Sequence, residues 1–146
     1  MAIELESFAE PWPREAFSEI DRDRSLHCRV AIVGDAVAGF VVYRQSAGLT
    51  ELQNLAVAEG CRREGVATKL LEAIEVQPKD GFCRIVTRVK ENNFAAQSLL
   101  KKAGFRAVRI DRSFYETGDD AYQFQKWDTT EESNWLQPAN RLTPTA

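Results

Sequence analysis

The segment CRREGVATKLLEAI (residues 61–74) places two arginines and one glycine directly before a pattern typical of a helix. The first turn of a helix exposes unpaired N–H groups and a partial positive charge, which call for a hydrogen-bond acceptor. No Ser, Thr, Asp or Asn stands immediately before this helix to cap it. An anion from outside the chain is therefore a candidate acceptor. Gly65 would let a phosphate approach the N–H groups of residues 63–68 closely.

The motif R-x-x-G-x-A on its own has two interpretations. It fits a phosphate-binding turn, but many ordinary helix starts look similar, and there the glycine serves only the geometry of a solvated turn. The elements on either side of the motif decide between these interpretations.

Three strand-like runs precede the motif, at residues 26–33, 36–45 and 49–58. They are separated only by Gly34-Asp35 and by Ser46-Ala47-Gly48. Turns this short predict an antiparallel meander.

Helices and strands alternate after the meander. An apolar stripe at Val66, Leu70 and Ile74 predicts a helix. A β-rich run, a second helix and two strands of a closing hairpin are predicted at residues 82–90, 93–103, 105–114 and 121–127. A short amphipathic helix is predicted before the meander, from Pro13 to Ile20. This order predicts a mixed α/β sheet in which a helix carries the chain from the third strand to a parallel fourth.

The length and composition are those of one globular domain. The chain has 146 residues, and its net charge of −3 provides no basic surface for nucleic acid. No apolar run reaches the roughly 20 residues of a membrane helix, and no signal-peptide pattern follows Met1, so we expect a cytoplasmic protein. Cys28, Cys61, Cys83 and the lone His27 have no spacing typical of a disulfide framework or a metal site.

The composition changes near the C-terminus. From Asp128 onward it becomes polar and proline-containing, without periodicity. We therefore predict a domain at residues 1–127 and a flexible tail at residues 128–146, in which Trp135 is a candidate for docking on the domain.

A series of motifs resembles the GCN5-related N-acetyltransferase (GNAT) superfamily across almost the whole chain. The series consists of NLAV at 54–57, the R-x-x-G-x-A turn at 62–67, N-x-x-A-x-x-L at 93–99, and Gly104-Phe105. The resemblance implies a mixed, mostly antiparallel sheet whose central parallel pair is splayed around acetyl-coenzyme A (acetyl-CoA). It implies cofactor contacts at Leu55, Ala56, Val57, Arg62, Arg63, Glu64, Gly65, Val66, Ala67, Thr68 and Asn93.

Within the superfamily the chain looks most like the ribosomal-protein alanine N-acetyltransferases and other protein N-terminal acetyltransferases. The segments at 8–17 (FAEPWPREAF) and 113–124 (SFYETGDDAYQF) carry this resemblance. It implies that Trp12 and the region of Tyr115 shape the acceptor site, although Trp12 is equally typical of a core anchor.

Two positions depart from that subfamily. The subfamily has a catalytic glutamate in a Glu-Val-Arg triplet, and Arg88 stands at that position here. It also has a tyrosine in a Leu-Tyr pair that protonates the departing thiolate, and Leu100 stands at that position here.

Aminolysis of a thioester still requires a base. Glu51 is our candidate, because it lies six residues before Val57 on the same predicted strand and so is expected on the same side as Leu55 and Val57. The position matches the catalytic glutamate of the histone-acetylating branch, and the alternative is an ordinary exposed carboxylate. For the acid we expect Tyr115, with water as the alternative. The N–H group of Val57 could meet the oxyanion.

A third departure concerns the first strand. Residues 3–8 (IELESF) resemble only the end of the family's first helix, so the first strand has no counterpart. The sheet edge that this leaves predicts a homodimer.

The function expected from this resemblance is direct transfer of an acetyl group from acetyl-CoA to a primary amine, with a peptide N-terminus or a lysine favoured. A small-molecule amine acetyltransferase and a non-catalytic CoA-binding module are the alternatives, and a purely structural domain is a third.

Overall fold

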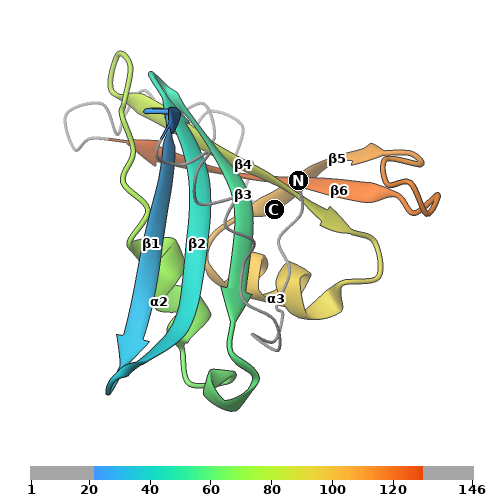
Figure 1. Cartoon of the computed structure of the whole chain (residues 1–146). Coiled ribbons are helices and arrows are strands. Elements are labelled where there is room, and N and C mark those ends of the chain that lie inside the picture. The colour runs from blue at the N-terminus through green and yellow to red at the C-terminus, as the bar shows by residue number, and fades with distance from the viewer. Residues whose placement is uncertain (1–21, 130–146) are drawn as a thin grey trace.

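The computed structural model describes residues 22–129 (Figure 1). Their strands form one six-stranded sheet in the order β1-β2-β3-β4-β6-β5. The strands are β1 (Leu26–Val33), β2 (Ala36–Ser46), β3 (Leu49–Val57), β4 (Phe82–Lys90), β5 (Arg106–Asp111) and β6 (Ala121–Thr129). The helical elements are the 3-10 turn η1 (Glu59–Cys61) and the helices α2 (Val66–Glu72) and α3 (Phe94–Lys102). The predicted helix at 13–20, Trp12, Trp135 and residues 3–8 lie outside the described residues.

The first three strands form the predicted antiparallel meander. β1 pairs with β2 from Leu26↔Arg44 to Val33↔Ala36, and β2 pairs with β3 from Gly39↔Val57 to Ser46↔Leu49. The expected hairpin is also confirmed, because β5 pairs antiparallel with β6. β6 in turn pairs with β4, so the hairpin extends the sheet beyond the parallel pair.

The parallel pair at the centre of the sheet is unusually short. β3 and β4 pair only at Leu49↔Arg84, Thr50↔Ile85 and Glu51↔Val86. Beyond these three pairs the two strands diverge, and β4 turns away from β3 toward the lower right of Figure 1. The sheet is therefore splayed at its parallel pair, as the sequence resemblance implied.

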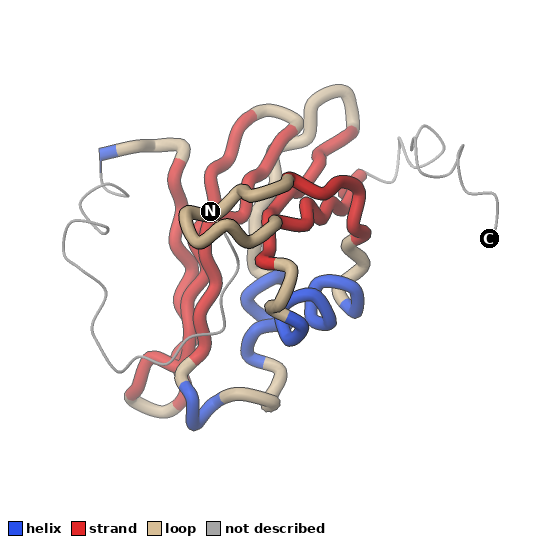
Figure 2. The backbone as a smooth tube through the Cα atoms, turned by 90° about the vertical axis from the view of Figure 1, so that its right-hand side faces the viewer, coloured by secondary structure: helices blue, strands red, loops and turns tan. Residues whose placement is uncertain are grey.

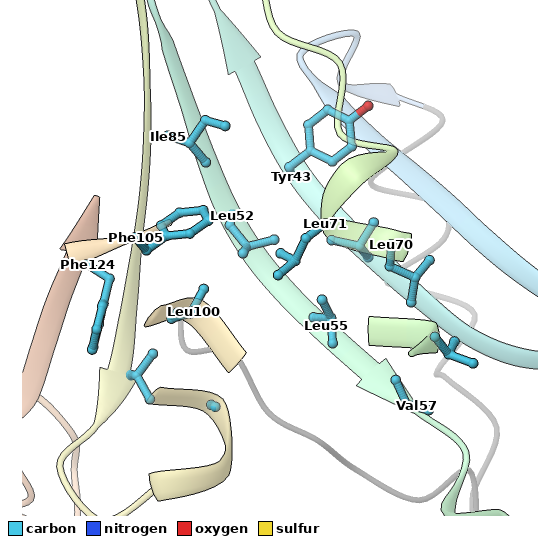
Figure 3. Close-up of a cluster of buried hydrophobic side chains, with 14 of the residues drawn as sticks. Tyr43, Leu52, Leu55, Val57, Leu70, Leu71, Ile85, Leu100, Phe105 and Phe124 are labelled. Carbon is cyan, nitrogen blue, oxygen red and sulfur yellow. The ribbon is translucent and has the colours of Figure 1, made fainter. Parts of the chain in front are cut away.

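α2 packs on one side of the first three strands, and α3 lies on the same side of the sheet (Figure 2). Apolar side chains from α2, α3, β3 and β4 meet there in the main core, where Leu55 and Leu100 are both 0% exposed (Figure 3). Buried and partly exposed residues alternate strictly along β4, and Cys83, Ile85 and Val89 are among the buried ones. A second, smaller cluster of Phe40, Val42 and Ala56 lies apart from the main core.

Element ends differ from the predictions by a few residues. β5 ends at Asp111, three residues early, and Ser113 has a φ of 49° that interrupts the extended backbone. β6 continues through Thr129, so Asp128 pairs with Cys83 instead of opening the predicted tail. Within residues 22–129 no helix is long and apolar enough to cross a membrane. β1 and β5 are the edge strands of the described sheet, and the expected homodimer stays a prediction.

Candidate active site

The start of α2 opens onto a pocket of about 160 Å³. It collects most of the residues that the sequence resemblance assigned to the cofactor. Its lining is Val57, Cys61, Arg62, Arg63, Gly65, Val66, Ala67, Thr68 and Leu99.

The backbone at this turn presents unpaired N–H groups. Gly65 is the N-cap of α2 with a φ of 80°, and no side chain caps the helix. The first bond of the helix runs from the N–H of Lys69 to the carbonyl of Gly65 at 3.0 Å, so the N–H groups of Val66, Ala67 and Thr68 precede the helical ladder. A Cβ built on Gly65 would meet no atom within 4 Å, so the approach to these groups is open.

Arg62 links this turn to the end of β3. Its Nε donates a hydrogen bond to the carbonyl oxygen of Val57 at 3.2 Å. The neighbouring Arg63 adopts a φ of 64°, which is uncommon for a residue with a side chain. The turn between β3 and α2 is thus held in one shape by a side-chain hydrogen bond and two left-handed residues.

Four predicted cofactor residues do not line this pocket. Leu55 is fully buried in the main core and Ala56 lies in the second cluster, so only their backbone atoms could contact a ligand. Glu64 is exposed. Asn93 caps α3, where its Oδ1 accepts the N–H of Ala96 at 3.1 Å.

Glu51 lies on the opposite side of β3 from the one we expected. A bulge in the β2–β3 pairing sets Val42 opposite Asn54 but Tyr43 opposite Leu52, which leaves Gln53 as an extra residue. Leu52, Leu55 and Val57 consequently share the main core, although strict alternation would separate Leu52 from the other two (Figure 3). The prediction that Glu51 shares a side with Leu55 and Val57 was therefore wrong, because one inserted residue reverses the alternation.

On its actual side Glu51 lines a polar cleft of about 340 Å³. The cleft lies where the pairing of β3 with β4 ends, since Glu51↔Val86 is the last pair. Its lining is Leu49, Glu51, Leu52, Gln53, Arg84, Val86, Thr87, Arg88, Arg109 and Gln123, and we call it the acceptor-side cleft.

Two side chains make hydrogen bonds near the point where the strands diverge. The Thr87 hydroxyl donates to the carbonyl oxygen of Leu52 at 3.2 Å, directly beyond the last pair of the β3–β4 ladder. The Gln97 amide donates to the carbonyl oxygens of Lys90 at 3.1 Å and Glu91 at 2.9 Å, which ties α3 to the end of β4.

The backbone of Val57 faces the opening between the two strands. The N–H of Ala58 donates to the carbonyl of Ala38 at 2.8 Å, which makes Val57 and Gly39 a pair without mutual hydrogen bonds. The Val57 N–H therefore points away from β2, toward the side from which β4 has diverged.

Arg88 is held in an ion-pair cluster beside the acceptor-side cleft. Its Nε lies 2.8 Å from Asp111 Oδ2, and Arg109 Nε lies 2.9 Å from the other oxygen, Oδ1. The hydrogen bond from Arg88 and, after it, that from Arg109 hold the pKa of Asp111 below its ordinary value. The Arg88 guanidinium also lies 5.0 Å from the centre of the Phe114 ring.

Tyr115 lies in the loop between β5 and β6, beside the end of β4. The Lys90 ammonium is 5.1 Å from the centre of its ring. Burial raises the pKa of Tyr115, and the positive charge of Arg88 acts in the opposite direction. Its hydroxyl is buried and has no hydrogen-bond partner within the described residues. The phenol is therefore protonated at neutral pH and has a proton that it can donate.

The family model described as "Acetyltransferase (GNAT) family" matches residues 1–105. This chain belongs to the GNAT acetyltransferase family. The family resemblance inferred from the sequence motifs is thereby confirmed.

Two related proteins and two solved structures of other proteins are similar to this GNAT chain along most of its length. An N-alpha-acetyltransferase of Saccharolobus solfataricus is 32% identical over 127 residues, which covers 77% of this chain and 76% of the relative. One from Sulfurisphaera tokodaii is 31% identical over 127 residues, with the same coverage of 77% and 76%. The structure of the ribosomal-protein-S18-alanine N-acetyltransferase from Escherichia coli has a TM-score of 0.67 at 21% identity and covers 86% of this chain and 83% of its own. That of Ard1 from Thermoplasma volcanium has a TM-score of 0.66 at 23% identity and covers 84% of each chain.

The side chains at the two positions that depart from the subfamily pattern, Arg88 and Leu100, have structural roles in this GNAT chain. Leu100 is fully buried in the main core, and Arg88 is committed to Asp111. Neither side chain can act as the acid or base that the subfamily places there.

Sequence reasoning missed five polar residues of the acceptor-side cleft: Gln53, Arg84, Thr87, Arg109 and Gln123. They come from four different strands, and only the strand order β3-β4-β6-β5 brings them together. The one signal present in the sequence is the alternation of β4, which sets Arg84 and Arg88 on the side of β4 opposite the buried Ile85.

Proposed function

We propose that this chain is an N-alpha-acetyltransferase that transfers an acetyl group directly from acetyl-CoA to the free amine at the N-terminus of a peptide. The observation that carries the proposal is the parallel pair of β3 and β4, which opens after three residues. The uncapped turn before α2 follows the end of β3, and a polar cleft with a carboxylate lies where the pair opens. Family membership and the two N-alpha-acetyltransferase relatives support the choice of reaction.

The residues at the α2 turn fit the phosphates of acetyl-CoA. The N–H groups of Val66, Ala67 and Thr68 are available before the helical ladder begins, and the side chains of Arg62 and Arg63 line the same pocket. Leu55, Ala56 and Val57 would contribute backbone atoms only. Acetyl-CoA supplies an acetyl group activated as a thioester.

The side chains around the splay could manage the protons of this reaction. The amine must be neutral to attack, so a base must take its proton, and the Glu51 carboxylate is the only acidic side chain lining the cleft within the described residues. Tyr115 lines neither the pocket at α2 nor the acceptor-side cleft, so its buried hydroxyl could give a proton to the departing sulfur only after it is uncovered. The N–H of Val57 could stabilise negative charge that develops on the acetyl oxygen.

The proposal is tested by measuring CoA release with three peptides: one with a free N-terminus, the same peptide with an acetylated N-terminus, and an acetylated peptide that contains lysine. We expect release with the first peptide only. Release with the lysine peptide alone would assign the enzyme to lysine side chains instead.

A non-catalytic CoA-binding module is the second candidate, because Arg88 and Leu100 occupy the two usual catalytic positions. This alternative predicts that acetyl-CoA raises the melting temperature while none of the peptides, nor any small polyamine, releases CoA.

A further inference from the structure

The acceptor-side cleft has a charge pattern that the acetyl-transfer reaction does not require. Three of its lining residues are arginines, namely Arg84, Arg88 and Arg109, and Glu51 is the only acid among them. None of the three arginines lines the pocket at the start of α2. Their charge therefore acts on the acceptor that enters this cleft and not on a ligand in the pocket at the start of α2.

The three arginines are not equivalent. Arg88 and Arg109 both pair with Asp111, which partly neutralises them. For Arg84 no acidic partner is found among residues 22–129. With Glu51 counted as negative, the cleft keeps one uncompensated positive charge, and Arg84 is the side chain whose guanidinium has no carboxylate.

The cleft also contains an unsatisfied hydrogen-bond acceptor. The Oε1 atom of Gln123 is buried and has no partner within the described residues. Gln123 pairs with Arg88 on one side and with Arg109 on the other, so it lies between the two strands that carry these arginines. A buried amide oxygen of this kind calls for an N–H donor. The cleft thus offers a cation for a carboxylate and an acceptor for an N–H group, and an acidic peptide supplies both.

The spacing along the strands agrees with this. Arg84 pairs with Leu49 and Val86 pairs with Glu51, so Arg84 and Glu51 are two residues apart along the parallel pair. Two residues of a strand span about 7 Å. A peptide extends by about 3.3–3.6 Å per residue, so an amine at Glu51 puts the side chain of the second or third residue near Arg84.

We propose that the acceptor-side cleft selects peptides with an acidic side chain at the second or third position, and that Arg84 is the residue that sets this preference. The proposal rests on the proposed function and specifies its substrate class. The volume of about 340 Å³ is at the small end for ligand sites and suits the first few residues of a chain.

The test compares kcat/KM for peptides that differ only in Glu, Gln or Lys at the second and third positions. We expect the Glu peptide to exceed the Gln peptide by about tenfold, as for a charge-assisted contact, and to exceed the Lys peptide by more. Arg84→Gln should remove the difference between Glu and Gln while the Gln peptide keeps its rate within about twofold. Arg84→Glu should make the Lys peptide the better substrate.

The matched control is Arg106→Gln, which makes the same change in net charge at an exposed position of β5 outside the cleft. It should keep the Glu preference. Binding of fluorescent Glu and Gln peptides, measured by anisotropy at low and high salt, gives a readout that needs no turnover: binding of the Glu peptide should weaken with salt and with Arg84→Gln.

Equal kcat/KM for the Glu and Gln peptides would overturn the acidic preference and leave the acetyltransferase proposal intact. An equal loss with all peptides in Arg84→Gln would make Arg84 a structural residue and overturn its assigned role. If no peptide released CoA, the proposed function would fail, whereas Arg84-dependent binding of the Glu peptide would still support the cleft as a site for acidic peptides.

Discussion

At the scale of single residues, Glu51 is the one acidic side chain that lines the acceptor-side cleft within the described residues. The sequence singled it out as the base, on the expectation that it shares a side with Leu55 and Val57. The bulge at Gln53 reverses that side and puts Glu51 in the acceptor-side cleft. A single inserted residue leaves no clear mark in the sequence, so which side of the sheet a strand residue faces could not be predicted beyond the bulge.

Glu51→Gln tests the assigned base. Because glutamine cannot accept the proton of the amine, we expect kcat to fall by about 10²-fold or more while the affinity for acetyl-CoA stays unchanged. Turnover and cofactor binding should be measured on the same protein sample. Glu72→Gln is the control, since Glu72 is an exposed carboxylate on α2. Full turnover in Glu51→Gln would show that Glu51 is not the base.

Asp111 makes a pH-dependent contribution to stability. Its pKa in the folded chain lies below the ordinary value of 3.8, chiefly because of the hydrogen bond from Arg88. The unfolded chain therefore binds the proton more readily, so the stabilising contribution is present above about pH 4 and disappears as the pH falls through the folded pKa.

This is tested by melting temperatures of the parent protein and of Asp111→Asn between pH 7 and pH 2. We expect the variant to melt lower at pH 7 and the difference to shrink toward zero at pH 2. A difference that persists at pH 2 would mean that the carboxylate charge is not what stabilises this cluster.

At the scale of elements, the strands and helices followed the sequence closely because their apolar periods are regular and their turns short. β1 and β4 have the predicted bounds, and Gly104, which follows α3, has a φ of 94°. The length of the β3–β4 pairing was not predictable, because a periodic apolar pattern does not show where two neighbouring strands cease to pair.

Thr87→Val tests the side-chain hydrogen bond that joins β4 to β3 at the end of their pairing. Valine has nearly the shape of threonine but cannot donate to the Leu52 carbonyl, and leaving that buried acceptor unpaired should cost about 1–3 kcal/mol of unfolding free energy. Urea denaturation measures the loss. Thr117→Val is the control: it removes only an exposed hydrogen bond, from the Thr117 hydroxyl to Asp119 Oδ2, and should change stability little. Unchanged stability in Thr87→Val would show that this hydrogen bond does not stabilise the folded chain.

Gly65→Ala tests the turn before α2. A Cβ there meets no atom, but the φ of 80° is unfavourable for alanine by about 1–2 kcal/mol. We expect a lower melting temperature and weaker binding of acetyl-CoA, measured by calorimetry. Gly60→Ala is the control, because Gly60 also has open space around it but no positive φ. Unchanged affinity for acetyl-CoA in Gly65→Ala would show that the turn before α2 does not bind the cofactor.

At the scale of the whole molecule, the sheet consists of two parts joined by a three-residue parallel pair, with the α2 turn after β3 and a polar cleft at the opening. The net charge of −3 gives no indication that this cleft is positive. Arg84, Arg88 and Arg109 lie on β4 and β5, and β6 intervenes between those strands. Their grouping follows from the strand order β4-β6-β5, which became apparent only in the structure.

The most direct test of the central claim is to map the acetylated position on one peptide that contains both a free N-terminus and an internal lysine. After incubation with acetyl-CoA and the protein, tandem mass spectrometry identifies the modified amine. The proposed N-alpha-acetyltransferase should place a single acetyl group on the N-terminal amine and leave the lysine unmodified. Acetylation of the lysine alone, or an unmodified peptide in the presence of bound cofactor, would contradict the proposed function.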